Sequence, residues 1–336
     1  MRMNFAIVGC GRIAGRHAEN IMRFGTLIAV CDNDRVKADE FAVQHHATSY
    51  YGIEDLLQHE KDIQVAIICT PNGLHAVHSI QCLEAGMHVL CEKPLAISVN
   101  DAKNMIDVAK KQKKRLFIVK QNRYNPPVVE VKKLLDADKL GKIYSFQINC
   151  FWNRPPDYYK DSWRGTKEFD GGTLFTQFSH FIDLLYWMLG DVSRVKSIVK
   201  NLGHPEIEIE DTGMVIFEMK SGATGTLNYT VNSYQKNMEG SFVIFAEHGT
   251  VKIGGEYLNE LEYQMIGNHL PLQIPVSAKP NLYGYYQGSM SNHDKVYEDL
   301  VKALNHNEHT MPGAEDGLKT VEIIQMIYQA AALKPL

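Results

Sequence analysis

The sequence lacks any excess of basic charge. Its 336 residues carry 35 Lys and Arg against 39 Asp and Glu, for a net charge of −4, so nothing in the balance favours a polyanionic partner. The only basic cluster, KKQKKR at 110–115, closes a helical pattern, and cations stabilise the carboxyl end of a helix. We therefore expect a solvated helix end and no nucleic-acid partner.

Cysteine is sparse and has no metal-binding spacing. The six cysteines, at 10, 31, 69, 82, 91 and 150, include no CxxC pair. Four of them stand at or just after apolar strand-like runs, where we expect small buried side chains and reduced thiols. The 14 histidines also show no paired spacing with a carboxylate. The sequence therefore predicts no metal site.

Long apolar runs are missing as well. The longest candidate, HFIDLLYWMLG at 180–190, is interrupted by Asp183 and is too short to span a membrane. The chain opens on the strand-like MNFAIVG without a basic region followed by a separate apolar stretch, so we expect no signal peptide. These absences predict no membrane partner and a cytoplasmic location.

The regular pattern of the first 120 residues alternates apolar strands with amphipathic helices. Strand-like runs at 3–8, 26–31, 65–69, 88–91 and 116–120 are separated by helical patterns near 12–24, 34–45, 73–85 and 98–112. Short apolar strands separated by helices are typical of a parallel sheet that is buried on both faces. We predict a Rossmann-type, doubly wound α/β domain over residues 1–122, which binds its ligand at the carboxyl ends of the strands.

The pattern changes after Asn122. A helix near 127–137 is followed by a strand, a loop rich in Pro and Tyr at 153–169, a helix over about 171–190, several strands between 193 and 266, and two closing helices. We predict an α+β domain over 123–336 with a large, mostly antiparallel open sheet. Since one face of such a sheet needs a cover, we expect a homodimer or homotetramer that pairs through it.

A glycine motif joins the first strand to the first helix. FAIVGCGRIAGRHA supplies Gly9-x-Gly11-x-x-Ala14, in which the glycines allow a tight turn and close approach of a pyrophosphate. Asp32 follows about 20 residues later at the end of the second strand, where a ribose-binding acid is expected. Its carboxylate would repel a 2′-phosphate, and no Arg follows it immediately, which favours NAD over NADP. The structural alternative is an ordinary glycine turn and a solvated acid.

Two further strands end in polar turns. TPNGLH begins at residue 70 after one strand, and CEKPL spans 91–95 after the next. Thr-Pro-Asn is also good turn and capping chemistry, and a Glu-Lys pair is usually solvated, so either motif alone has a purely structural explanation. Together they lie on adjacent strands at the edge where a doubly wound sheet binds its ligand.

These turns, with QNRYNP at 121–126, resemble the glucose–fructose oxidoreductase / inositol dehydrogenase (Gfo/Idh/MocA) family of two-domain NAD(P)-dependent dehydrogenases. The resemblance extends over essentially the whole chain. It implies that Lys93 faces the reacting carbon and that Pro94 follows a peptide bond that is often cis. The cofactor-binding residues it implies are Gly9, Gly11, Arg12, Ile13, Asp32, Asn33, Thr70, Pro71, Asn72, His75, Glu92, Lys93, Gln121, Trp163 and Arg164.

DGGTLFTQFSHFIDLL at 170–185 resembles the helix that carries an Asp-x-x-x-His pair in this family. His180 matches the histidine, whereas Thr176 stands in place of the aspartate, which removes a carboxylate that would orient the imidazole. With YYKDSWRGTKEFDGG at 158–172, this departure resembles the sugar-nucleotide branch, which oxidises the 3-hydroxyl of UDP-N-acetyl-2-amino-2-deoxyglucuronate for surface polysaccharide. The substrate-binding residues it implies are Lys93, Arg123, Tyr124, Asn125, Tyr159, Thr176, Gln177 and His180.

The chemistry of such an oxidation requires a base for the hydroxyl proton and a cation for the developing alkoxide. We assign His180 as the base and Lys93 as the cation. Packing alone is the alternative for Tyr158 and Tyr159, and a core position is the alternative for His180. Two other functions remain open: a dehydrogenase of a free sugar or polyol, and a catalytically silent NAD-binding sensor. The sequence also leaves open whether a 2-oxo acid recycles a tightly bound cofactor.

Overall fold

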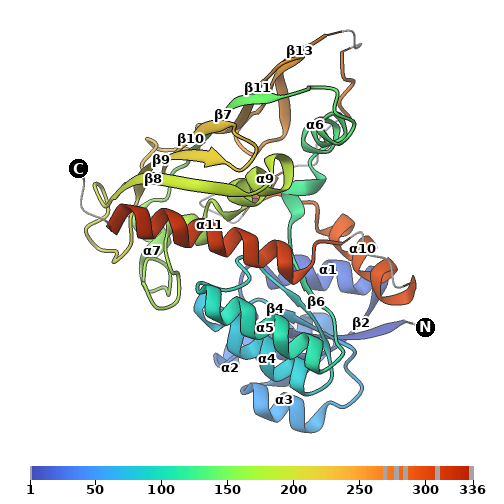
Figure 1. Ribbon diagram of the computed structural model, residues 1–336. Helices are drawn as coiled ribbons and strands as arrows, with labels where there is room; N and C mark the ends of the chain where they lie inside the picture. The colour runs from blue at the N-terminus through green and yellow to red at the C-terminus, as the bar shows by residue number, and fades with distance from the viewer. Residues whose placement is uncertain (1, 268–270, 276–279, 283–286, 307–310, 333–336) are drawn as a thin grey trace. The chain divides into compact units, whose positions relative to one another are not determined.

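The computed structural model describes residues 2–267, 271–275, 280–282, 287–306 and 311–332 (Figure 1). Within them the chain forms two compact units. The first contains Met1–Lys120, Glu168–Asp170 and His293–Val321, and the second contains Gln121–Lys167, Gly171–Asn292 and Glu322–Leu336. The first unit therefore includes segments beyond the 1–122 range expected for the nucleotide-binding domain.

The first unit is built on a six-stranded parallel sheet of order β3-β2-β1-β4-β5-β6. This is the doubly wound order in which the chain reverses direction next to β1, so ligands bind beyond the carboxyl ends of β1 and β4. Its strands are β1 (Met3–Val8), β2 (Gly25–Cys31), β3 (Thr48–Tyr50), β4 (Val65–Ile68), β5 (His88–Cys91) and β6 (Leu116–Ile118). Its helices are α1 (Ala14–Phe24), α2 (Arg35–His45), α3 (Ile53–His59), η1 (Asn72–Leu74), α4 (His75–Glu84), α5 (Val99–Lys111), α10 (His293–His306) and the start of α11 (Ala314–Ala332).

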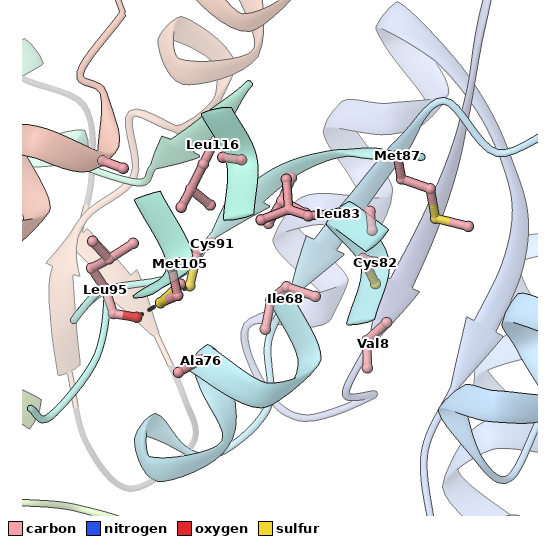
Figure 2. Close-up of a cluster of buried hydrophobic side chains, with 14 of the residues drawn as sticks. Val8, Ile68, Ala76, Cys82, Leu83, Met87, Cys91, Leu95, Met105 and Leu116 are labelled. Carbon is pink, nitrogen blue, oxygen red and sulfur yellow. Dashed lines mark hydrogen bonds between the residues drawn. The ribbon is translucent and has the colours of Figure 1, made fainter. Parts of the chain in front are cut away.

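One face of this sheet packs on α4 and α5 in a tight apolar core (Figure 2). Val8 and Ile68 from the strands meet Leu83 and Met105 from the helices, all nearly or fully buried. Cys82 and Cys91 fill small gaps in this core, and burial raises the pKa of the Cys82 thiol to about 12. All six cysteines are free, as the sequence predicts.

The second unit holds a seven-stranded sheet of order β13-β12-β11-β7-β10-β9-β8. All its strand pairs are antiparallel except β7 with β10, so the sheet is mixed but mostly antiparallel, as expected. The strands are β7 (Ile143–Phe151), β8 (Val192–Lys200), β9 (Thr212–Met219), β10 (Thr224–Thr230), β11 (Glu239–Ala246), β12 (Gly249–Gly254) and β13 (Glu260–Ile266). The helices are η2 (Gln121–Tyr124), α6 (Pro126–Asp136), α7 (Pro156–Tyr159), α8 (Thr173–Thr176), α9 (Ser179–Leu189) and the end of α11, and β14 (Pro280–Leu282) and β15 (Gln287–Met290) form a separate pair.

Two details of the secondary structure differ from the sequence prediction. The short strand β3 and the helix α3 follow α2, where no element was expected. The helix expected over about 171–190 is instead two helices, because α8 ends at Thr176 and α9 begins at Ser179. Among the helices that the structure describes, none is long and apolar enough to cross a membrane.

Candidate active site

The glycine loop after β1 has the shape that a dinucleotide requires. Gly9 has a φ of +98°, and a Cβ there would lie 2.7 Å from the carbonyl carbon of Cys69, so no other residue fits. A Cβ on Gly11 would meet no atom within 4 Å, so this side of the loop is open. Ala14, fully buried, lets the start of α1 pack against the strand. The loop therefore fits a pyrophosphate at the amino end of α1.

Asp32 stands beside this loop at the end of β2. Its Oδ2 accepts a hydrogen bond of 2.8 Å from the backbone of Cys10, and its Oδ1 accepts one of 2.9 Å from the backbone of Asp34. Both bonds fix the carboxylate while the side chain stays partly exposed. Arg12 and Asn33 are exposed on the same stretch of the unit, and Ile13 is partly buried. This geometry fits an acid that binds the ribose hydroxyls of NAD.

Asp32→Asn should therefore weaken NAD binding about tenfold to a hundredfold, since a hydrogen bond to a charged group is lost. The same change should improve NADP binding, because the repulsion of a 2′-phosphate disappears. Titration of both cofactors by fluorescence measures the two effects. Asp34→Asn is the matched control, because the Asp34 side chain caps α2 and pairs with the exposed Lys37 of the same helix. Equal losses for the two cofactors would contradict the assigned role of Asp32.

The Thr-Pro-Asn turn after β4 is fixed by contacts inside the first unit. Asn72 is buried and its Nδ2 donates to the carbonyl of Asp170 at 2.9 Å, and the Gly73 amide donates to the carbonyl of Phe169 at 2.9 Å. The Thr70 hydroxyl lies 3.1 Å from Nδ1 of His78. Asn72 thus has a structural bond in addition to its proposed place along NAD, while Thr70 and Pro71 remain partly exposed.

His75 connects the two polar turns. Its Nδ1 lies 2.6 Å from the carbonyl of Pro94, and its Nε2 lies 2.9 Å from the carbonyl of Thr70. Burial lowers the pKa of His75, so the ring is neutral near pH 7 and donates to one of these carbonyls at a time. The side chain is 1% exposed. It therefore holds the two turns together from inside the unit.

The Glu-Lys-Pro turn follows β5, and its Lys93–Pro94 peptide bond is cis, as the family resemblance implies. The Lys93 side chain is partly exposed, whereas Glu92 is buried. The Oε1 atom of Glu92 accepts a hydrogen bond of 2.8 Å from His17 Nε2 and lies 3.5 Å from His293 Nε2. Sequence reasoning missed both histidines because they are far from the turn along the chain.

His17, Glu92 and His293 are the one group of potential metal ligands in the described residues whose ligand atoms all lie within 4.8 Å of one another. The sequence predicted no such group. Zinc bound at about 2.0–2.2 Å holds its nitrogen and oxygen ligands apart in a tetrahedron. Here the 2.8 Å contact between His17 and Glu92 is instead a direct hydrogen bond. The arrangement is that of a bonded polar cluster.

In the second unit, a buried carboxylate fixes the start of α8. Glu210 accepts hydrogen bonds from the Tyr328 hydroxyl at 2.6 Å and the Tyr229 hydroxyl at 3.2 Å. It also accepts from the Leu174 amide at 3.3 Å, and its backbone carbonyl accepts from the Thr173 hydroxyl. Nothing in the sequence singled out Glu210. Through these bonds it fixes the segment that leads to His180.

The break between α8 and α9 changes the relation of Thr176 to His180. Their four-residue spacing predicted one shared helix face, but the helix is interrupted at Gln177 and Phe178. His180 lies in the first turn of α9 and is 2% exposed, whereas Thr176 is partly exposed at the end of α8. Thr176 and His180 therefore belong to two separate helices and not to one continuous helix.

Gln177 belongs to a buried network with Arg154. Its Oε1 accepts a hydrogen bond of 2.7 Å from Arg154 Nε, and its Nε2 donates a hydrogen bond of 2.8 Å to the Tyr158 hydroxyl. Arg154 also donates to Asn237 Oδ1 at 3.2 Å and lies over the Trp152 ring. The network joins α8 to the loop after β7. Arg154 was not predicted from sequence.

Arg123 and Asn125 both have structural partners in the second unit. Arg123 forms a two-bond ion pair with Asp183, at 2.8 and 2.7 Å, and both side chains are buried. Asn125 Nδ2 donates to the carbonyls of Tyr257 and Leu258, and its Oδ1 accepts from Asn292 at 2.7 Å. Gln121 is buried beside them and Tyr124 is partly exposed.

The loop after β7 packs through aromatic rings. Tyr158 and Tyr159 meet edge to face at 5.0 Å in a small cluster with Ile207 and Ile209. Arg164 lies 4.8 Å from the ring of Trp163, and both are partly exposed. Beside this loop an open groove of about 750 Å³ is lined by Asn153, Arg154, His204, Asn232 and Tyr234 among others. The tight packing of Tyr159 agrees with the structural alternative given for it.

A doubly wound sheet with a glycine loop and a fixed acid after β2 defines an NAD-binding unit, and the chain as a whole has the architecture of a two-domain dehydrogenase. Residues 3–120 match the model of an oxidoreductase family with an NAD-binding Rossmann fold, and residues 128–252 match the GFO/IDH/MocA C-terminal domain. The chain belongs to the Gfo/Idh/MocA family of NAD-binding oxidoreductases, as its motifs indicated. It is thus a member of a sugar dehydrogenase family.

Two solved structures and one curated relative are similar over most of the chain. The WlbA dehydrogenase of Chromobacterium violaceum, in complex with NADH and UDP-GlcNAcA, is 35% identical with a TM-score of 0.88, covering 98% of this chain and 94% of that one. WlbA of Bordetella pertussis, with the same two ligands, is 31% identical with a TM-score of 0.91 over 100% of both chains. The levoglucosan dehydrogenase of Pseudarthrobacter phenanthrenivorans is 28% identical over 88% of this chain and 84% of its own length.

Proposed function

We propose that this protein oxidises the 3-hydroxyl of UDP-N-acetyl-2-amino-2-deoxyglucuronate to a ketone, with NAD as the hydride acceptor, in surface polysaccharide synthesis. The observation that carries the proposal is the likeness, at 31–35% identity over nearly whole chains, to two dehydrogenases solved with NADH and UDP-GlcNAcA.

In this proposal two side chains of the protein perform the proton and charge chemistry. His180 takes the proton of the sugar hydroxyl on its imidazole, and Lys93 stabilises the negative charge that develops on the oxygen. The glycine loop and Asp32 of the first unit would hold NAD, which would supply the hydride acceptor for this oxidation. The loops that carry Tyr124, Tyr159, Trp163, Arg164 and Gln177 are proposed to line the sugar and nicotinamide sites.

A free sugar is the second candidate substrate, and the similarity to a levoglucosan dehydrogenase favours it. A panel of UDP-sugars, free sugars and polyols, followed by NADH absorbance, separates the two. We expect reduction of NAD with UDP-N-acetyl-2-amino-2-deoxyglucuronate at a rate well above that with any free sugar. Inositol or glucose as the best substrate would overturn the proposal, and NAD that no sugar reduces would favour the sensor.

A separate measurement on the purified protein tests cofactor recycling. NAD that copurifies with the protein and is reoxidised by a 2-oxo acid would identify a cofactor recycled in place. Cofactor that exchanges freely during purification would identify an ordinary two-substrate dehydrogenase.

We also propose that the open face of the seven-stranded sheet pairs two copies of the chain. Apolar side chains stand exposed on it, among them Ile198 at 62%, Met214 at 61% and Ile216 at 56%. The strand register places Met214 opposite Ile198 and Ile216 opposite Lys196, so the apolar groups alternate with polar ones, as in an interface between soluble copies.

Ile216→Glu should convert the oligomer to a monomer, because a charge would be buried in the paired face. Light scattering at micromolar concentration measures the mass directly. Val43→Glu is the matched control, since Val43 is 77% exposed on α2 of the first unit. A wild-type monomer would contradict the proposed pairing.

A further inference from the structure

The carboxylate of Glu92 is the centre of a buried polar chain within the first unit. The Tyr297 hydroxyl lies 2.9 Å from His17 Nδ1, and His17 Nε2 lies 2.8 Å from Glu92 Oε1. The second carboxylate oxygen, Oε2, accepts a hydrogen bond of 3.1 Å from the backbone N–H of Lys93. These hydrogen bonds therefore link three elements: α10 through Tyr297, α1 through His17 and the end of β5 through Glu92.

The hydrogen bonds between Tyr297, His17 and Glu92 determine which atom carries each proton. A neutral imidazole has one donor and one acceptor nitrogen. If Nε2 of His17 donates to the carboxylate, Nδ1 must accept the hydroxyl proton of Tyr297, and every group in the chain is then satisfied. Burial lowers the pKa of His17, which agrees with a neutral ring. His17 and Tyr297 are both 0% exposed, so water does not supply substitute bonds.

Ionisation of Glu92 depends on these partners. Burial alone would raise its pKa, but the bond from His17 and the approach of His293 outweigh burial and hold the pKa of Glu92 well below its usual value. Other titratable groups in the described residues whose charge couples to this carboxylate include His75 from α4, Cys69 after β4, Cys91 in β5 and Tyr297 from α10. None of these four supplies a cation at neutral pH, since burial lowers the pKa of His75 and raises those of the thiols and the phenol.

We propose that His17 is a positioning residue of this dehydrogenase: its hydrogen bond holds the Glu92 carboxylate in place and thereby fixes the backbone turn that presents Lys93. The inference rests on the proposed role of Lys93, but its geometry lies wholly within the first unit. Without the bond from His17, the Glu92 carboxylate would no longer hold the Lys93 amide, and the Lys93 side chain would be displaced. A displacement of about 1 Å at a reacting group costs about a hundredfold in rate.

Three variants separate positioning from packing. His17→Phe keeps an aromatic ring but has no donor for Glu92. His17→Gln restores an amide N–H near the position of Nε2. Glu92→Gln replaces the carboxylate by a group that does not titrate. His59→Gln is the matched control, because His59 is exposed on α3 of the same unit.

The first readout is the melting temperature of the cofactor-free protein between pH 4.5 and 8, which requires no substrate. In the wild type the depressed pKa of Glu92 contributes stability above its unfolded value of about 4.3, and this is lost as the pH falls. In His17→Phe only the more distant His293 opposes the effect of burial, so the pKa of Glu92 rises. The carboxyl then takes up a proton at higher pH, and stability falls as the pH rises through that range. His17→Gln should keep the wild-type melting profile. The double variant His17→Phe/Glu92→Gln should lack the pH-dependent change of the His17→Phe profile.

The second readout is kinetic. We expect His17→Phe to lower kcat about 10- to 100-fold with a new acid-side inflection in its pH profile, and His17→Gln to recover most of the loss. If no UDP-sugar is a substrate, the proposed function fails while the melting profiles still test the network. The inference is overturned by a wild-type melting profile in His17→Phe, by equal impairment of His17→Phe and His17→Gln, or by a stoichiometric metal ion in the purified protein.

Discussion

Lys93→Met and His180→Asn should each reduce turnover at least ~100-fold while NADH still binds. Methionine has nearly the length of lysine but no charge, so the alkoxide loses its cation. Asparagine fills part of the imidazole volume but cannot take up a proton from the hydroxyl. Turnover is followed by NADH absorbance and NADH affinity by fluorescence, so that loss of chemistry is separated from loss of cofactor.

Matched controls come from each unit. Lys103→Met removes an exposed lysine from α5, and His248→Asn removes an exposed histidine from the turn between β11 and β12. Both should retain wild-type rates. His180 is 2% exposed, so its variant must also melt cooperatively before its rate is interpreted. Near-normal turnover in either active-site variant would refute the assignment of Lys93 and His180.

The features that were predicted well from sequence are those fixed by short spacing. Gly9 adopts a positive φ in the turn directly after β1, and Asp32 follows directly after β2, so each residue is defined by its position within a few residues of a strand end. The cis bond before Pro94 was implied by the resemblance of the short Glu-Lys-Pro motif to the family. Local chemistry of this kind is visible in the sequence, and it correctly gave the parallel sheet, the cofactor class and the family.

The broken helix shows where a periodic pattern gives a wrong answer. Residues 171–190 are apolar enough to suggest one continuous helix, yet the chain turns at Gln177 and Phe178. The Gln177 side chain is bound on both sides, by Arg154 and Tyr158, which lie on a separate segment after β7. Such tertiary bonds override helical periodicity, and no window around Gln177 contains them.

Contacts between distant segments were not predictable for the same reason. His17 is 75 residues from Glu92, and Arg123 is 60 residues from Asp183. The motif around Arg123 resembled a substrate-binding segment, but resemblance does not show which side chain of a motif bonds inside the protein. In the sequence Asp183 only interrupts an apolar run, and the structure shows that its partner is Arg123.

Asp183→Asn should destabilise the protein by about 3–5 kcal/mol, because it leaves the Arg123 guanidinium buried without its carboxylate. The Arg123 and Asp183 side chains are only 8% and 1% exposed, so water cannot replace the lost partner. The ring of Trp187, 5.0 Å from the guanidinium, offers only a weaker attraction to the charge. Equilibrium unfolding in urea measures the change in free energy.

The double variant Arg123→Met/Asp183→Leu tests whether the cost comes from the unpaired charge. Replacing both partners of a buried ion pair by apolar groups is often neutral or stabilising, so most of the stability should return. Glu218→Gln is the control for an exposed pair, since Arg194 and Glu218 are 67% and 44% exposed, and it should have little effect. A double variant as unstable as Asp183→Asn would show that packing around α9, rather than the ion pair, accounts for the loss.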